Sequence, residues 1–195
     1  MLINKLEKHR LILASGSPRR QKFLKEMGLD FEIKLHPIDE VYPENLKADE
    51  ITDYLAKLKA NPFLDGLQAN DIVITSDTIV WHNKKSLGKP VDKREAVQML
   101  QMLSNSWHKV ITSICFTTAN SQKVVHCSTK VRFKKLTDEE IHFYVEKYNP
   151  LDKAGSYGIQ EWIGAIAVKQ IKGSYNNVMG LPTHLFHKTL AKIVS

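Results

Sequence analysis

Apolar residues along the chain recur with two periods, which predict alternating strands and helices. Short apolar runs rich in β-branched residues predict strands at residues 11–14, 31–35, 71–82, 108–118, 123–136 and 165–175. Longer segments with apolar residues three or four apart, or with helix-start signals, predict helices at residues 18–27, 49–60, 92–103 and 137–148, and a last helix capped by Thr183. This alternation predicts an α/β fold around a mixed sheet.

Turn and capping residues sharpen several of these boundaries. Gly28 suits the left-handed position that ends a helix. Asp92 with Glu95, and Thr137 with Glu140, have the spacing of a capping box. The polar stretch NKK after the third strand predicts a hairpin turn, and AGSYGIQ predicts a glycine-bearing loop. From its length, residues 1–195 are expected to form one domain with one or two lobes.

Composition and charge restrict the class of protein and its possible partners only slightly. The chain has 195 residues, of which 43% are apolar and 25% are charged, which is typical of a globular protein with a substantial core. A net charge of +7 fits a polyanionic partner such as a nucleotide, a nucleic acid or a membrane surface, although charge alone decides little. No apolar run approaches the about 18 residues of a membrane-spanning helix, and the charged start MLINKLEKHR does not suit a signal peptide.

The two cysteines favour a reducing compartment. Cys115 and Cys127 lie on neighbouring predicted strands and could pair, but two thiols in a chain of this size do not make a disulfide framework. We therefore expect a cytoplasmic protein without a membrane partner.

The stretch SGSPRR joins the first predicted strand to the first helix. Ser17 and Pro18 suit the N-cap and the first helical position, where the helix dipole is positive. Ser15 adds a second hydroxyl, and the guanidinium groups of Arg19 and Arg20 suit bidentate contact with phosphate oxygens. The stretch therefore predicts an anion site; the alternative is that Ser17 only caps the helix and the arginines are solvated.

Asp77 is the most informative acidic residue, because it interrupts the apolar strand IVITSDTIV. Burying its carboxylate is costly unless it meets a metal ion, a cation or several donors. The alternative is an aspartate that pairs with a lysine. Glu40 in an acidic loop and Lys59 near the end of a helix are weaker candidates by themselves, while Lys89 lies in a tight Gly-Lys-Pro corner.

The chain resembles the Maf family, the septum-formation-inhibitor-like nucleoside triphosphate pyrophosphatases. The resemblance covers nearly the whole chain and rests on the order of the stretches SGSPRR, DE before the helix ending LAKLKA, SDTIV, LGKP, DKAGSYGIQ and GSYNNVMGLP. It implies a two-lobed fold with an elongated mixed sheet, flanking helices and a cleft, similar to the inosine triphosphate pyrophosphatases. It also implies hydrolysis between the α and β phosphates with a divalent cation, Mg²⁺ or Mn²⁺, and a homodimer.

The resemblance also implies roles for individual residues. The acid/base position of the family falls on Asp77 and its acidic loop residue on Glu40, and both would bind the metal ion. The groups facing the phosphates would be Ser15, Ser17, Arg19, Arg20, Lys59 and Lys89.

The branch of the family that acts on thymidine and uridine triphosphates is matched by three residues. Arg19, Thr78 and Gln160 fall on the positions that distinguish it, and a glutamine amide can both donate to and accept from the imide edge of uracil or thymine. The alternative for Gln160 is a loop amide that bonds backbone groups. The chain departs from the family pattern after this glutamine, where Glu161 and Trp162 precede Gly164 and lengthen the loop by one residue.

Two other classes of function stay open. The protein could be a nucleotide-binding regulator of cell division that does not hydrolyse its ligand, but a sensor would need only the positive groups and not the two carboxylates. It could bind nucleic acid through its basic surface. The aromatic residues lie mostly in apolar patterns and do not alternate with lysine or arginine on one strand face, so no stable nucleic-acid partner is expected.

Overall fold

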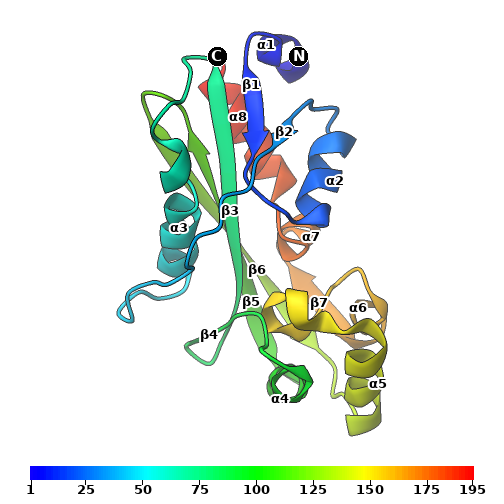
Figure 1. The fold of residues 1–195 in the computed structure, drawn as a ribbon. Coiled ribbons are helices and arrows are strands. Elements are labelled where there is room, and N and C mark those ends of the chain that lie inside the picture. The colour runs from blue at the N-terminus through cyan, green and yellow to red at the C-terminus, as the bar shows by residue number, and fades with distance from the viewer. The chain divides into compact units, whose positions relative to one another are not determined.

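Seven strands form one mixed sheet in the computed structural model, which describes all residues 1–195 (Figure 1). The strands are β1 (Arg10–Leu13), β2 (Glu32–Ile33), β3 (Asp71–His82), β4 (Lys85–Leu87), β5 (Trp107–Thr117), β6 (Gln122–Phe133) and β7 (Val168–Lys172). Their order is β2-β1-β3-β5-β6-β7, with β4 paired to β3. β1 is parallel to both β2 and β3. β4 is antiparallel to β3, and β7 is antiparallel to β6. The predicted α/β class with a mixed sheet is confirmed.

The chain divides into two compact units, which are described separately. Unit 1 comprises Met1–Asp77, Thr112–Cys127 and Gly180–Ser195, and unit 2 comprises Thr78–Ile111 and Ser128–Met179. The strands β3, β5 and β6 each supply residues to both units.

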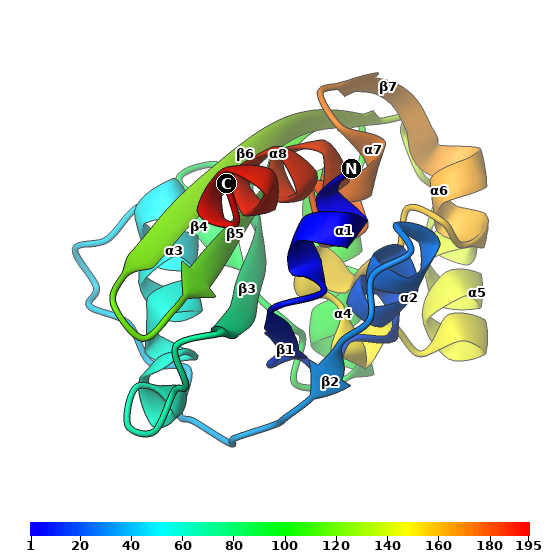
Figure 2. The same ribbon diagram turned by 90° about the horizontal axis from the view of Figure 1, so that it is seen from above.

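Unit 1 contains a parallel part of the sheet and four α-helices. The helices are α1 (Leu2–Leu6), α2 (Pro18–Glu26), α3 (Asp49–Leu58) and α8 (Thr183–Ile193), with a short 3-10 helix at Asn61–Phe63. Leu11, Ile12 and Leu13 of β1 are all buried, as expected for a parallel strand covered on both faces. Accordingly, α2 and α3 lie on opposite sides of β3 in both views (Figures 1 and 2).

Unit 2 packs its helices on one face of the sheet. They are α4 (Lys93–Leu103), α5 (Asp138–Tyr148), α6 (Trp162–Ala167) and α7 (Tyr175–Val178), with 3-10 helices at Pro150–Asp152 and Ala154–Ser156. Strand residues Val80, Val110 and Val131 join Leu100 of α4 and Tyr144 of α5 in one buried cluster. Since side chains alternate along a strand, the residues directly before and after each of these valines point to the other face of the sheet.

The capping residues correctly predicted where the two longest helices of unit 2 begin. Asp92 accepts a hydrogen bond from the Glu95 backbone NH at 2.7 Å at the start of α4. Thr137 and Glu140 form a reciprocal capping box at the start of α5. These contacts satisfy backbone donors that the first turn of a helix leaves without partners.

The sequence misplaced two features near the C-terminus. Residues 165–167 were predicted to begin a strand, but they end the short helix α6, and β7 starts only at Val168. Thr183 was predicted to cap the last helix, but Pro182 is the N-cap of α8 and Thr183 is its first helical residue. The first error arises because β-branched residues favour strands locally, while tertiary packing buries Ile163 and Ala167 as one side of a helical turn.

Neither Cys115 nor Cys127 forms a disulfide bond. Cys115 is buried, and burial raises the pKa of its thiol. No helix has both the length and the apolar character needed to cross a membrane.

Candidate functional site

Lys59 connects two carboxylates in unit 1. It lies at the C-cap of α3, and its ammonium group is 2.7 Å from Asp77 Oδ1 and 3.0 Å from Glu40 Oε2. The side chains of Asp77 and Lys59 are only 8% and 18% exposed, whereas that of Glu40 is 47% exposed. The alternative that Asp77 pairs with a lysine is therefore realised, within a cluster that also contains the acidic loop residue.

Two buried side-chain oxygens of β3 lack partners. Asp77 Oδ2 and the neighbouring Ser76 Oγ are buried, and neither makes a hydrogen bond. Most buried polar atoms in folded proteins are hydrogen-bonded, and an unsatisfied one costs about 1–3 kcal/mol. The unpartnered carboxylate oxygen therefore marks a place that suits a ligand or a cation.

Arg20 of α2 is held by three oxygen acceptors. Its Nε donates to the Gly180 carbonyl at 3.0 Å, and its Nη1 donates to the Ser76 carbonyl at 2.9 Å and to Ser15 Oγ at 3.2 Å. Burial lowers the pKa of Arg20 to about 10, partly opposed by the negative charge of Asp77. The guanidinium therefore stays positive at neutral pH, and its three hydrogen bonds fix its orientation.

The N-terminus of α2 differs from a simple capped helix. Ser17 is the N-cap and Pro18 follows it, as predicted, but the Ser17 hydroxyl makes no capping hydrogen bond. Instead, the Ser17 backbone NH donates to Ser15 Oγ at 3.3 Å. The alternative that Ser17 only caps the helix is therefore wrong, and Arg19 lies half-buried in the same first turn.

Seven of the ten predicted site residues belong to unit 1 and three belong to unit 2. The first group is Ser15, Ser17, Arg19, Arg20, Glu40, Lys59 and Asp77; the second is Thr78, Lys89 and Gln160. Within unit 1, hydrogen bonds or ion pairs join Ser15 to Arg20, and Lys59 to both carboxylates. In unit 2, Thr78 is half-buried in β3, whereas Lys89 and Gln160 are exposed.

The loop that carries Gln160 is tied closely to the sheet of unit 2. Gly155 has a φ of 67°, and its NH donates to the Gly88 carbonyl at 3.0 Å. A Cβ at Gly155 would lie 2.7 Å from a Val80 methyl group, so only glycine allows this approach. This contact fixes the start of the loop beside the corner that precedes Lys89.

Glu161 anchors the segment after Gln160. This residue is the N-cap of α6, accepts a hydrogen bond from the Tyr144 hydroxyl, and lies 3.1 Å from the Lys153 ammonium group. Lys153 is only 9% exposed and also pairs with Asp152 at 2.7 Å. Glu161, which directly follows Gln160 in the sequence, therefore ties the start of α6 to Tyr144 and Lys153.

Sequence reasoning missed a second polar cluster in unit 1. Ligand atoms of Asp49, Asp53 and His126 all lie within 4.8 Å of one another. Asp53 also accepts a hydrogen bond from the Ser113 hydroxyl at 2.6 Å. The two aspartates are four residues apart on α3, but His126 comes from β6, so only the folded chain brings the imidazole to them.

The mixed sheet and its flanking helices define an α/β protein with the fold of the HAM1 proteins. A HAM1 protein from Coxiella burnetii superimposes with a TM-score of 0.51 at 15% identity, covering 94% of this chain and 99% of that chain. The family model described as Maf-like protein matches residues 10–193, and this chain belongs to the Maf family.

Curated relatives match the chain over its full length. A dTTP/UTP pyrophosphatase from Flavobacterium johnsoniae is 55% identical over 194 residues, covering 100% of both chains. A dTTP/UTP pyrophosphatase from Phocaeicola vulgatus is 47% identical, covering 98% of this chain and 100% of the relative. The family recognised from the ordered motifs is confirmed.

Proposed function

We propose that this chain is a nucleoside triphosphate pyrophosphatase that converts dTTP and UTP, or modified pyrimidine triphosphates, to the monophosphate and pyrophosphate. The observation that carries the proposal is the buried Asp77 carboxylate, which Lys59 holds through one oxygen while the other has no partner. The names of the full-length relatives support the choice of substrates.

Asp77 and Glu40 are the residues that we assign to a divalent cation, Mg²⁺ or Mn²⁺. The fit rests on the unpartnered Asp77 Oδ2 and on the half-exposed Glu40 carboxylate, since both ions prefer oxygen ligands. A bound cation would neutralise phosphate charge and lower the pKa of a water molecule.

The hydrolysis itself needs a base, a nucleophilic water and charge stabilisation. Asp77 accepts a proton from the water as the water oxygen bonds to the α-phosphorus, and the bond from that phosphorus to the bridging oxygen breaks. Negative charge then moves to the departing pyrophosphate. Arg20 and Lys59, with Lys89 of unit 2, are assigned to stabilise this charge.

Hydroxyl and base contacts complete the assignment. Ser15 and Ser17 donate to phosphate oxygens rather than attack phosphorus, which agrees with a Ser17 hydroxyl that does not cap α2. Arg19, Thr78 and Gln160 are assigned to the choice of base, with the Gln160 amide facing the imide edge of the pyrimidine.

We further propose that the enzyme is cytoplasmic and works as a homodimer. The reduced state of Cys115 and Cys127, which form no disulfide bond, agrees with a reducing compartment. Sedimentation velocity of the purified chain tests the dimer, and a single species with the mass of one chain would contradict it.

The reaction is tested by hydrolysis in ¹⁸O-labelled water. The chain is mixed with dTTP, UTP, modified pyrimidine triphosphates or purine triphosphates, with Mg²⁺ or Mn²⁺, and products are separated by mass. Attack at the α-phosphorus places the label in dTMP and leaves pyrophosphate unlabelled, and chelation of the metal stops turnover. Label in pyrophosphate, or purine turnover without dTTP or UTP turnover, would contradict the proposal. Tight nucleotide binding without any product would favour the non-hydrolysing regulator instead.

A further inference from the structure

One face of the unit 2 sheet is not used by the proposed reaction. Along β5, Val110 points into the buried cluster, so Lys109 and Trp107 point to the opposite face. The same alternation applies on β6, where Val131 is buried and Lys130 is exposed. Positive and aromatic side chains therefore gather on the face that the helices of unit 2 leave uncovered.

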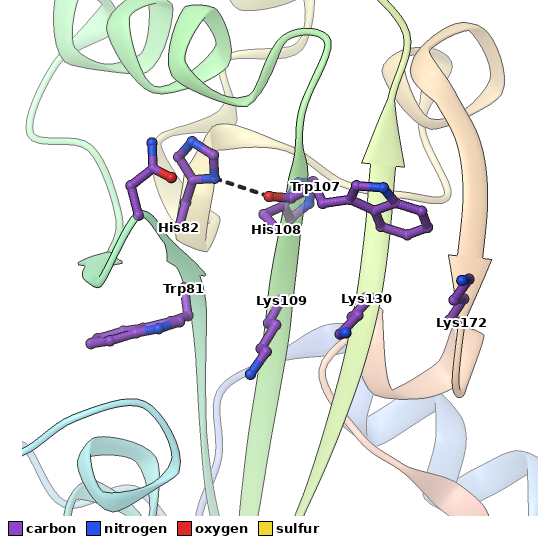
Figure 3. A pocket seen from close by; sticks show the side chains of 8 residues that line it. Trp81, His82, Trp107, His108, Lys109, Lys130 and Lys172 are labelled. Atoms are coloured by element: carbon purple, nitrogen blue, oxygen red, sulfur yellow. Dashed lines mark hydrogen bonds between the residues drawn. The ribbon is translucent and has the colours of Figure 1, made fainter.

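These side chains line a hollow of about 420 Å³ (Figure 3). It is lined by Trp81, His82, Asn83, Trp107, His108, Lys109, Lys130 and Lys172. The lining contains no carboxylate and none of the residues assigned to the pyrophosphatase reaction. His82 Nδ1 is 3.1 Å from the Trp107 carbonyl, a contact that joins β3 to the start of β5. The hollow therefore has a fixed backbone and a positive, aromatic lining.

The lysines of this face are placed at some cost to folding. Lys130 and Lys172 are directly opposite each other in the register of β6 and β7. Like charges in directly opposite positions of an antiparallel pair are destabilising. Lys172 does lie 5.4 Å from the Trp107 ring centroid, and Arg132 lies 5.9 Å from it. These contacts orient the cations against an aromatic surface but leave their charge without a counter-ion, so an anion would relieve the repulsion.

The spacing of the groups favours a ligand with several phosphates and more than one base. The order β3-β5-β6-β7 places Trp81, Lys109, Lys130 and Lys172 on four successive strands. At about 4.8 Å between strands, the row is about 14 Å across, and its three lysines span about 10 Å. One base and one phosphate group would engage only part of this row.

We propose that this face, the Trp81–Lys172 face, binds single-stranded nucleic acid. Bases stack on the indoles of Trp81 and Trp107, while Lys109, Lys130 and Lys172 contact successive phosphates. An acidic peptide would satisfy the lysines but would make less use of the two indoles. The proposal does not depend on the pyrophosphatase reaction. It reverses our expectation from the sequence, because the strand order gathers aromatic and basic residues from four strands on one face.

The test measures the fluorescence anisotropy of labelled 12-mers of deoxythymidine and of uridine, which separate DNA from RNA as the ligand. We expect dissociation constants in the range of roughly 1–100 µM, weakening as salt rises. Three phosphate contacts to a single strand give a slope of about −2 in log K against log[salt]. The variant Lys109→Gln/Lys130→Gln/Lys172→Gln should therefore bind about 100-fold more weakly at 0.1 M salt and lose most of this slope.

Two further variants separate the face from overall charge. Lys8→Gln/Lys123→Gln/Lys188→Gln removes the same three charges from exposed positions of unit 1 and should retain affinity within about threefold. Trp81→Leu should weaken binding roughly tenfold without changing the salt slope, since stacking involves no counter-ion release. Pyrophosphatase activity and the thermal midpoint serve as controls for folding.

Four results would overturn the proposal. The first is no anisotropy change at several hundred micromolar protein, and the second is an equal loss of binding in both triple-lysine variants. The third is displacement of the oligonucleotide by a non-hydrolysable dTTP analogue, which would place binding at the substrate site. The fourth is a dimer that the Lys109→Gln/Lys130→Gln/Lys172→Gln variant abolishes while the parent binds no oligonucleotide, which would assign the face to contact between two copies of the chain.

Discussion

Gly164→Ala should disturb the base-side loop of unit 2 more than a single added methyl group normally would. A Cβ at this position would lie 1.8 Å from the Ile159 carbonyl oxygen and 2.4 Å from its carbon. Non-bonded heavy atoms normally lie about 3.5 Å apart, so the loop or the start of α6 must move by more than about 1 Å. The atoms met belong to the backbone and cannot rotate away. We expect a loss of about 3 kcal/mol, near the upper end for overpacking.

The displaced segment includes Gln160, which directly follows Ile159. A loss of about 3 kcal/mol lowers the thermal midpoint of a chain of this length by about 6–12 °C. A misplacement of about 1 Å at a positioning residue costs up to about 100-fold in rate, so kcat/KM for dTTP should fall by about 10- to 100-fold and the preference over purine triphosphates should narrow. Calorimetry and steady-state kinetics measure the two effects.

The matched control is Gly88→Ala, in the same unit, where a Cβ meets no atom within 4 Å. It should change stability by less than about 1 kcal/mol and leave nucleotide preference unchanged. If Gly164→Ala matches the parent in thermal midpoint and in nucleotide preference, the close approach and its link to Gln160 are refuted.

Three more outcomes follow from particular contacts. Arg19→Ala should change the relative preference among nucleotides more than Arg20→Ala, which should lower kcat/KM for all of them; equal losses on every substrate would contradict this division. Burial lowers the pKa of His108 from 6.5 to about 3, so the unfolded chain takes up this proton first and stability falls as pH drops below 6.5. His108→Phe should reduce the slope of unfolding free energy against pH by up to about 1.4 kcal/mol per pH unit between pH 6 and 4, measured by urea titration; an unchanged slope would refute the assignment. Glu161→Ala should cost about 2–3 kcal/mol in chemical denaturation, because Lys153 and Tyr144 lose an acceptor, while Glu161→Gln should cost less; equal costs would contradict this.

Local signals predicted the elements that depend on local interactions. β3 was placed correctly at both ends because its β-branched run is bounded by polar residues. Both capping pairs placed the starts of α4 and α5, since a cap is a contact between residues three apart. In contrast, α6 depends on Gly164 approaching the Ile159 backbone, which no propensity reports.

The candidate site residues also differ in how far the local sequence identifies them. Asp77 was recognisable because a carboxylate within an apolar strand needs a partner. Lys59 was only a weak candidate by itself, because a lysine near a helix end is usually solvated and its contact with Asp77 spans 18 residues of sequence. The Trp81–Lys172 face could not be predicted, since it requires the strand order β3-β5-β6-β7 and the register of β6 against β7.

Asp77→Asn shows whether Asp77 is the base of a pyrophosphatase site. The change keeps the size of the side chain but removes the carboxylate that pairs with Lys59. We expect pyrophosphate release from dTTP with Mg²⁺ to fall by about 10²- to 10⁴-fold, the usual contribution of a general base, in a variant that remains folded. Turnover within about threefold of the parent would contradict the role of Asp77 as the base.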